Sequence, residues 1–177
     1  AFKSVLLILS TVLVFTSCNK DDDKDDVILL DGFYIHGSVT PLANLNADGM
    51  MAVTRNEVTQ ANRSTLYEVY MPIKAGADGF SITEVSGSIR KVWGPGDTKV
   101  TAPGSYSDHV KTDYTRGNLI ETTNKFTVAA DGMYHIVIDT ELGIYLIIPV
   151  THCAVVGGAT PGDWSVETEL TPGTFDL

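Results

Sequence analysis

The chain is poor in the residues that most often carry catalysis, metal binding or nucleic-acid recognition. It has 4 His, 2 Cys and 2 Trp among 177 residues, and 12 Lys and Arg stand against 22 Asp and Glu. The His residues lack metal-ligand spacing, no Gly-x-Ser-x-Gly motif occurs, and sequence alone pairs no two carboxylates as a glycosidase would need. A nucleic-acid surface needs clustered cations, which a formal charge of -10 disfavours. We therefore expect no catalytic residue, no metal ion, no cofactor and no nucleic-acid partner.

The chain also lacks an apolar run long enough to cross a bilayer as a helix. The longest, Val5 to Phe15, has eleven residues, and a spanning helix needs roughly 20. Lys3 before the run and the polar residues after it are typical of a bacterial secretory leader. The segment ending in Ser17-Cys18 resembles a lipobox, with Phe15 where Leu is usual. Residues 1–17 are interpreted as a lipoprotein signal peptide; the alternatives are a short membrane anchor and a buried helix of a soluble protein.

An acidic segment follows the leader. Residues 18–26 contain two Lys and five Asp, bury nothing and are expected to form a solvated tether. The segment also resembles the Lys-Asp-Asp export tag of surface lipoproteins in the Bacteroidota. Leader and tether together predict an outer-membrane protein that is anchored through lipid on Cys18 and faces the cell exterior.

The scarcity of cysteine limits covalent cross-links. If Cys18 is acylated, Cys153 has no partner, so no intramolecular disulfide is expected. Cys153 begins an apolar string that extends to Val156, which predicts a buried and inert thiol. The fold must then depend on its hydrophobic core.

Alternation of apolar and polar residues dominates the chain after the tether. Tyr134, Ile136 and Ile138 share one face of a predicted strand, and His135 and Asp139 lie on the other. Further candidate strands are residues 33–38, 50–54, 67–71, 80–85, 88–93, 125–129 and 144–150. Asp-Gly pairs, which mark tight turns, precede several of them. No stretch after the leader has convincing helical spacing, so the sequence predicts an all-β fold, a β-sandwich.

A repeat divides the chain into modules. Residues 37–41 (Gly-Ser-Val-Thr-Pro) reappear 120 positions later as residues 157–161 (Gly-Gly-Ala-Thr-Pro), and each copy follows an apolar strand. This offset is about the length of one sandwich domain. We expect a first β-sandwich module over residues 27–150 and the start of a second, truncated module over residues 151–177.

The second copy of the repeat belongs to a longer string that resembles a known family. Residues 155–170 read Val-Val-Gly-Gly-Ala-Thr-Pro-Gly-Asp-Trp-Ser-Val-Glu-Thr-Glu-Leu. This string resembles the opening of carbohydrate-binding modules in the SusE/SusF family of starch-binding outer-membrane lipoproteins, with Asp163 for the usual second Gly and Glu167 for the usual Asp. Residues 134–140 and 147–150 are similar to the closing hairpin of the preceding module. The resemblance implies tandem sandwiches, immunoglobulin-like or carbohydrate-binding-module-like, that hold glycan near a transporter.

Sugar recognition needs a flat aromatic face for the pyranose ring and a few fixed polar groups for its hydroxyls. Trp164 matches the Trp of the family motif; the alternative is a structural Trp that plugs the end of the module. Trp93 follows Arg90 and Lys91 and precedes residues 94–97 (Gly-Pro-Gly-Asp), which predicts a strand end beside a turn with cations nearby. The alternative for Trp93 is packing in the core or at its rim.

Tyr106 and Tyr114 lie in the polar stretch 101–124, where loops usually carry function. The alternative is that both pack onto the sandwich. The candidate carbohydrate-binding residues are therefore Arg90, Lys91, Trp93, Tyr106, Tyr114 and Trp164.

These observations favour a non-catalytic surface lipoprotein that binds polysaccharide or oligosaccharide, and the resemblance implies an α-glucan such as starch, bound for uptake. The alternative is a spacer or protein-interaction sandwich that projects later binding modules. The first copy of the repeat supports this alternative because Leu-Ala-Asn, without a Trp, follows it. The expected partners are glycan, the outer membrane through Cys18 and an outer-membrane transporter complex.

Overall fold

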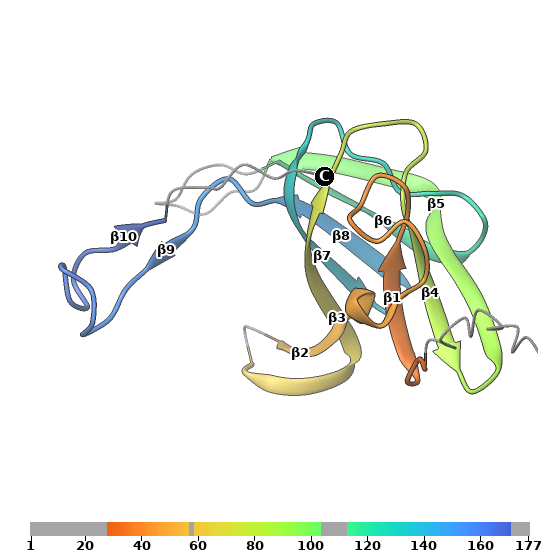
Figure 1. Ribbon diagram of the computed structural model, residues 1–177, viewed down its shortest axis with the longest axis horizontal. Helices are drawn as coiled ribbons and strands as arrows, with labels where there is room; N and C mark the ends of the chain where they lie inside the picture. Colours follow the sequence, from red (N-terminus) through yellow and green to blue (C-terminus); the bar gives the residue numbers. More distant parts are fainter. Residues whose placement is uncertain (1–27, 57–58, 104–112, 171–177) are drawn as a thin grey trace, which may run out of the picture.

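The computed structural model describes residues 28–56, 59–103 and 113–170. These residues form β-strands and one short 3-10 helix, and the described ranges contain no α-helix (Figure 1). The all-β prediction is therefore confirmed. The elements are β1 (Gly32–His36), η1 (Ala47–Gly49), β2 (Ala52–Asn56), β3 (Ala61–Ile73), β4 (Ser81–Ser86), β5 (Ile89–Pro103), β6 (Asp113–Glu121), β7 (Gly132–Asp139), β8 (Ile144–Pro149), β9 (Ala154–Val155) and β10 (Thr168–Glu169).

Strands β1 to β8 form one sheet that curls until its two edges meet. The strand order is β1-β4-β5-β6-β8-β7-β3-β2, and every neighbouring pair is antiparallel. Tyr34 in the edge strand β1 forms a bridge with Met50, which lies just before the other edge strand, β2. The backbone N–H of Met51 also donates to the carbonyl oxygen of Phe33 at 2.7 Å. The sheet therefore encloses its core between two facing layers, which is a sandwich-like arrangement.

The core lies between the inner surfaces of the curled sheet. Alternate side chains of each strand face inward, because successive residues of a strand lie on opposite faces. Phe80 and Phe126 stack with ring centroids 5.2 Å apart, and Phe126 meets Tyr145 edge-on at 4.8 Å. Burial of one such side chain contributes about 1.5–3 kcal/mol. The other core residues are Phe33, Ile35, Val39, Met51, Met71, Ile73, Ile82, Leu119, Tyr134, Ile136, Ile138 and Ile147.

The predicted faces of two central strands are confirmed. Strand β3 pairs with β7 so that Val69 lies opposite Ile136 and Met71 opposite Tyr134, and all four contact the core. His135 has the opposite orientation and belongs to the outer face. The alternation seen in the sequence therefore gives the correct inward and outward sides of these strands.

Strand β5 corrects one expectation. It continues through residues 94–97 without turning, so Trp93 lies inside a long strand and not at a strand end. The ladder with β6 becomes irregular just after Pro95. A Cβ at Gly94 would overlap the carbonyl oxygen of Asn124, so the backbones approach too closely there for any side chain. Glycine and proline mark an irregular strand here, where the sequence indicates a turn.

Strands β9 and β10 form a separate two-stranded sheet after the curled sheet ends at Pro149. Figure 1 shows this hairpin to one side of the curled sheet. Cys153 precedes β9 and is exposed, so the expectation of a buried thiol is wrong. The physical reason is that a two-stranded ribbon covers neither of its own faces.

The two copies of the sequence repeat adopt the same turn. The backbone N–H of Thr40 donates to the carbonyl of Gly37 at 2.9 Å, and that of Thr160 donates to Gly157 at 2.8 Å. The two Thr hydroxyls donate to the same carbonyls at 2.9 and 2.8 Å. The repeat in sequence is thus a repeat in local structure, stabilised by a Thr side chain that bonds to the backbone.

Candidate functional site

A groove of about 570 Å³ opens at one end of the curled sheet. It lies where the edges of the sheet separate beyond the Tyr34–Met50 bridge, and the end of β4 forms another wall. Figure 1 shows this end at the bottom of the view, with the β2–β3 hairpin on the left and the β4–β5 tip on the right. The volume is within the range of small-molecule sites, about 300–1,000 Å³. The lining includes Phe33, Met50, Val53, Tyr67, Glu84 and Ser86.

Two aromatic rings from different layers form the apolar part of the groove. Phe33 from β1 and Tyr67 from β3 have ring centroids 4.7 Å apart and planes inclined at 53°. Phe33 is buried, whereas Tyr67 is half-buried and packs against the core cluster. Met50 and Val53 continue the apolar surface and are exposed. The groove can therefore pack against the apolar side of a ring-shaped ligand.

Glu84 provides a fixed carboxylate in the same groove. It has the same inward orientation on β4 as Ile82, but it lies nearer the open end of the sheet. The indole Nε1 of Trp93 donates a hydrogen bond of 3.0 Å to Glu84 Oε2. Trp93 is half-buried and packs against the core, and Lys91 lies directly opposite Glu84 in the β4–β5 ladder. The structure thus brings two predicted residues beside the groove, with Trp93 as the support of Glu84.

The other predicted binding residues lie in separate parts of the molecule. Arg90 is exposed at the β4–β5 tip, where its Nη1 donates to two backbone carbonyls at 2.7 and 2.9 Å. Tyr114 belongs to strand β6 and not to a loop, and it is half-buried. Trp164 is 76% exposed between β9 and β10. Tyr106, like Cys18, lies outside the described residues. The described candidates do not form one cluster.

Sequence reasoning missed Glu84, Tyr67 and Phe33 as groove residues. The sequence does indicate the orientation of Glu84. It lies two residues after Ile82 in the candidate strand 80–85, so the two side chains share the inward face. No comparable signal exists for the approach of Phe33 to Tyr67. That contact depends on the curling of the sheet, which no local pattern encodes.

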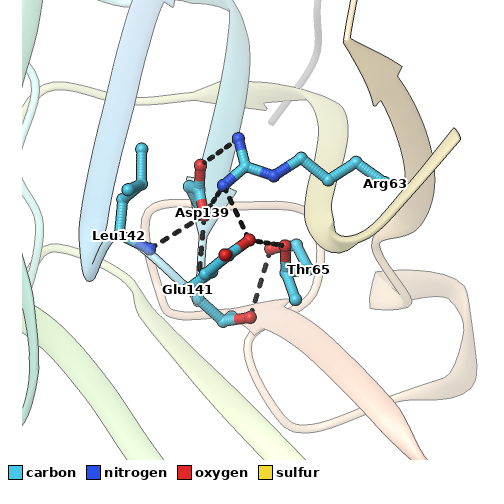
Figure 2. Close-up of polar contacts among 6 residues, drawn as sticks. Arg63, Thr65, Asp139, Glu141 and Leu142 are labelled. Carbon is cyan, nitrogen blue, oxygen red and sulfur yellow. Dashed lines mark hydrogen bonds and ion pairs between the residues drawn. The ribbon is translucent and has the colours of Figure 1, made fainter. Parts of the chain in front are cut away.

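A polar cluster at the β7–β8 turn is structural (Figure 2). Asp139 is 4% exposed, and its Oδ2 lies 2.8 Å from Arg63 Nη1. Its Oδ1 accepts from Arg63 Nη2 at 3.1 Å and from the backbone N–H groups of Glu141 and Leu142 at 3.1 and 3.0 Å. Glu141 accepts further hydrogen bonds from Arg63 and Thr65. Both oxygens of the Asp139 carboxylate have hydrogen-bond partners, and these contacts connect β3 to the turn. The burial of Asp139 is therefore explained by its structural contacts, without a role in binding.

Among the described residues, three titratable side chains have a pKa shifted by burial. Burial lowers the pKa of His36, and the charge of Lys125 lowers it further. The imidazole Nε2 of His36 lies 2.9 Å from Thr83 Oγ1. Burial raises the pKa of Tyr134, with a backbone hydrogen bond acting in the opposite direction, and burial also raises the pKa of Tyr145. None of the three is part of the groove lining, so the shifts bear on stability.

Within residues 28–56, 59–103 and 113–170, no three His, Cys, Asp or Glu side chains gather to hold a metal ion. The described part of the chain also has no helix with the length and apolar character needed to cross a membrane. No protein-family model, curated protein or solved structure matches this chain.

Proposed function

We propose that this chain is a non-catalytic glycan-binding lipoprotein of the cell surface, and that the groove receives the sugar. The observation that carries the proposal is the presence of Tyr67 and Glu84 in one groove. The half-buried ring of Tyr67 offers an apolar face to the C–H side of a pyranose. The carboxylate of Glu84 accepts hydrogen bonds from hydroxyls. This pairing of one aromatic surface with a fixed polar group is what sugar recognition requires.

Glu84 is suited to this role because its position is fixed before the ligand arrives. The hydrogen bond from Trp93 and the packing of the indole against the core hold the carboxylate in place. An ionised carboxylate has about four acceptor positions, so the indole leaves capacity for hydroxyl groups. A group that is already ordered loses little conformational freedom on binding, which favours affinity.

The charge of the groove favours a neutral glycan. The described residues that line it include the carboxylates of Asp31 and Glu84, and Lys91, opposite Glu84 in the β4–β5 ladder, is the cation beside them, so carboxylates outnumber cations at the groove. An anionic polysaccharide would meet repulsion there, since like charges in a partly buried site are unfavourable. An α-glucan such as starch is neutral, and it is also the ligand implied by the SusE/SusF-like string in residues 155–170.

The proposed location follows from the leader and tether. Lipid on Cys18 would anchor the chain in the outer membrane, and residues 18–26 would hold the sheet away from the surface. Labelling of cells with a fatty-acid analogue tests this location. We expect incorporation in the natural chain and none in Cys18→Ala. Equal incorporation in both would exclude lipidation at Cys18 and would leave the proposal of sugar binding in the groove untouched.

The second candidate function is a spacer that projects further binding modules or docks a transporter. The exposed apolar residues of the β9–β10 hairpin favour it. Trp164, Val156 and Val166 are exposed there, and exposed apolar side chains that lie together are typical of protein-interaction surfaces. The repeated turn at residues 37–41 and 157–161 fits tandem modules. In this alternative the groove binds no sugar, so one measurement of polysaccharide binding distinguishes the two functions.

Affinity electrophoresis through gels that contain amylopectin, xylan or mannan separates these functions. We expect at least one neutral polysaccharide to retard the chain, and amylopectin is the first choice. Glu84→Gln should weaken the retention about tenfold or more, because a hydrogen bond to a charged group contributes about 1.5–3 kcal/mol. Leu142→Ala, which removes an exposed side chain away from the groove, is the control and should migrate like the natural chain.

Migration that no polysaccharide retards would exclude the glycan-binding proposal for this region and leave the spacer. Incubation with the same polysaccharides should release no reducing sugar, because the chain is proposed to be non-catalytic.

A further inference from the structure

We infer that the outer face of the sheet carries a second glycan-binding platform, built from Tyr70, His135 and Glu68. The inference rests on the proposed glycan-binding function, and it adds a site on the other side of β3 from the groove. Tyr67 and Val69 contact the core, so the alternating residues Glu68 and Tyr70 face outward. The groove and the platform therefore use opposite faces of one strand.

Tyr70 presents a supported aromatic ring on the outer face. It stands directly opposite His135 in the β3–β7 ladder, and the two rings stack with centroids 4.2 Å apart and planes within 3° of parallel. Tyr70 is nevertheless 58% exposed. A ring that is held by a neighbour and still open to solvent loses little freedom when a sugar packs against it.

His135 and Glu68 supply polar groups beside this ring. The imidazole Nε2 of His135 lies 2.8 Å from Glu68 Oε2. A carboxylate only accepts hydrogen bonds, so Nε2 is the donor. The stack and the hydrogen bond hold His135 from two sides. Both polar side chains remain partly in contact with solvent, so sugar hydroxyls can reach their other hydrogen-bonding positions.

The neighbouring strands extend the platform with a mixed surface. Ile148 on β8 lies opposite His135, and Arg116 on β6 lies opposite Leu146 of β8. Ile148 and Leu146 are half-buried, and Arg116 is exposed, with the half-buried Tyr114 on the same face of β6. The face thus interleaves rings, aliphatic groups and charges of both signs. A neutral pyranose chain fits this surface because it offers C–H faces and hydroxyls without net charge.

Two sites on opposite faces of the sheet have a consequence for the kind of glycan that binds well. A short oligosaccharide fills each site separately, whereas a branched polymer can occupy both at once. Simultaneous occupation raises the apparent affinity through effective concentration. The chain should therefore bind amylopectin more tightly than it binds maltoheptaose at either site.

Calorimetric titration of the full chain with maltoheptaose, xylohexaose and mannohexaose tests the platform. We expect two sites per chain for the oligosaccharide that corresponds to the retarding polymer. Tyr70→Ala should weaken one site roughly tenfold and leave the other, because a single aromatic anchor often contributes this much. Tyr70→Phe keeps the ring and should keep both sites. The ring of Tyr70 is 58% exposed, so loss of its stack on His135 should lower the thermal unfolding midpoint by only a few degrees, and a cooperative melt of Tyr70→Ala will separate loss of binding from misfolding.

Glu84→Gln should weaken the other site, and His135→Ala should weaken the same site as Tyr70→Ala. Binding that Glu84→Gln weakens and Tyr70→Ala leaves intact would overturn the platform and support the groove. Binding that Tyr70→Ala weakens and Glu84→Gln leaves intact would support the platform and overturn the groove. A natural chain that binds none of the three oligosaccharides would overturn both.

Discussion

Replacement of Asp139 by Ala removes the centre of the polar cluster at the β7–β8 turn. The side chain is 4% exposed and forms a two-pronged pair with Arg63, with N–O distances of 2.8 and 3.1 Å. Its Oδ1 also accepts hydrogen bonds from the backbone N–H groups of Glu141 and Leu142. The substitution therefore leaves a guanidinium and two amides without their common acceptor, while the strands themselves remain intact.

The magnitude follows from the burial of the two partners. Removal of one member of a fully buried ion pair costs about 3–5 kcal/mol. The side chain of Arg63 is 26% exposed and also contacts Glu141 at 3.0 Å, so water and this second carboxylate recover part of the loss. The two backbone amides lie in a turn where water can replace their acceptor. We therefore expect the free energy of unfolding to fall by about 2–4 kcal/mol, a large part of the stability of an ordinary domain.

Urea unfolding monitored by circular dichroism measures this change. Asp139→Asn keeps an acceptor for the turn amides and removes the charge, so it should cost less than Asp139→Ala. Glu141→Ala is the matched control, since its side chain is 63% exposed and its pair with Arg63 should contribute at most about 1 kcal/mol. An effect of Asp139→Ala no larger than that of Glu141→Ala would refute the reasoning, because it would mean that the buried pair does not stabilise the fold.

Three further predictions concern other parts of the fold. Gly79→Ala should lower the free energy of unfolding by at least about 2 kcal/mol, since its φ is +59° and a Cβ would overlap the Phe126 carbonyl; Gly87→Ala, with φ +56° and open space around it, should cost only about 1 kcal/mol. Burial lowers the pKa of His36, so near and below the unfolded value of about 6.5 the unfolded chain binds more protons than the folded chain. Stability should therefore fall as the pH is lowered from about 7, and His36→Gln should reduce this slope in urea titrations. Cys153 should react with a maleimide in the native protein at the rate of a free thiol, as mapped by peptide mass spectrometry, whereas protection until denaturation would contradict its exposure.

Most strands and their faces could be predicted because alternation is a local property of the sequence. The exceptions are β6, which lies in a polar stretch that the sequence indicates as loop, and residues 125–129, which form only an isolated bridge between Phe126 and Phe80. Tyr134, Ile136 and Ile138 face the core, and His135 faces outward, as their spacing indicates. The turn shared by residues 37–41 and 157–161 is local for the same reason, since a Thr hydroxyl and a Gly carbonyl three residues earlier suffice to form it. Local chemistry therefore determines most elements, the faces of the alternating strands and short turns.

The groove could not be predicted, because it depends on the order and curl of the strands. Phe33 and Tyr67 come together only when the two edges of the sheet meet at the Tyr34–Met50 bridge. Trp93 was a binding candidate because the residues after it indicate a turn. In the folded chain the strand continues, and the indole instead packs against the core and supports Glu84. A side chain's position in a strand is local, whereas its partners are set by the whole sheet.

The burial of Cys153 was predicted wrongly for a related reason. An apolar string predicts burial only where a second layer covers it, and the hairpin of β9 and β10 has two strands alone. The exposed Val155 and Val156 on the same string show the same effect. Apolar composition describes what a segment can bury, and the surrounding layers decide whether burial occurs.

The indole N–H signals of the two tryptophans provide the most direct test of sugar binding in the groove. Trp93 donates its N–H to Glu84, whereas Trp164 is exposed in the distant hairpin, so the two signals in a ¹H–¹⁵N correlation spectrum report separately. The signal that disappears in Trp93→Phe belongs to Trp93, and the one that remains belongs to Trp164. During titration with maltoheptaose, or with the oligosaccharide of whichever polymer retards the chain, we predict a saturable shift of the Trp93 signal and an unchanged Trp164 signal. A Trp93 signal that stays in place while the glycan is demonstrably bound would contradict the groove as the binding site.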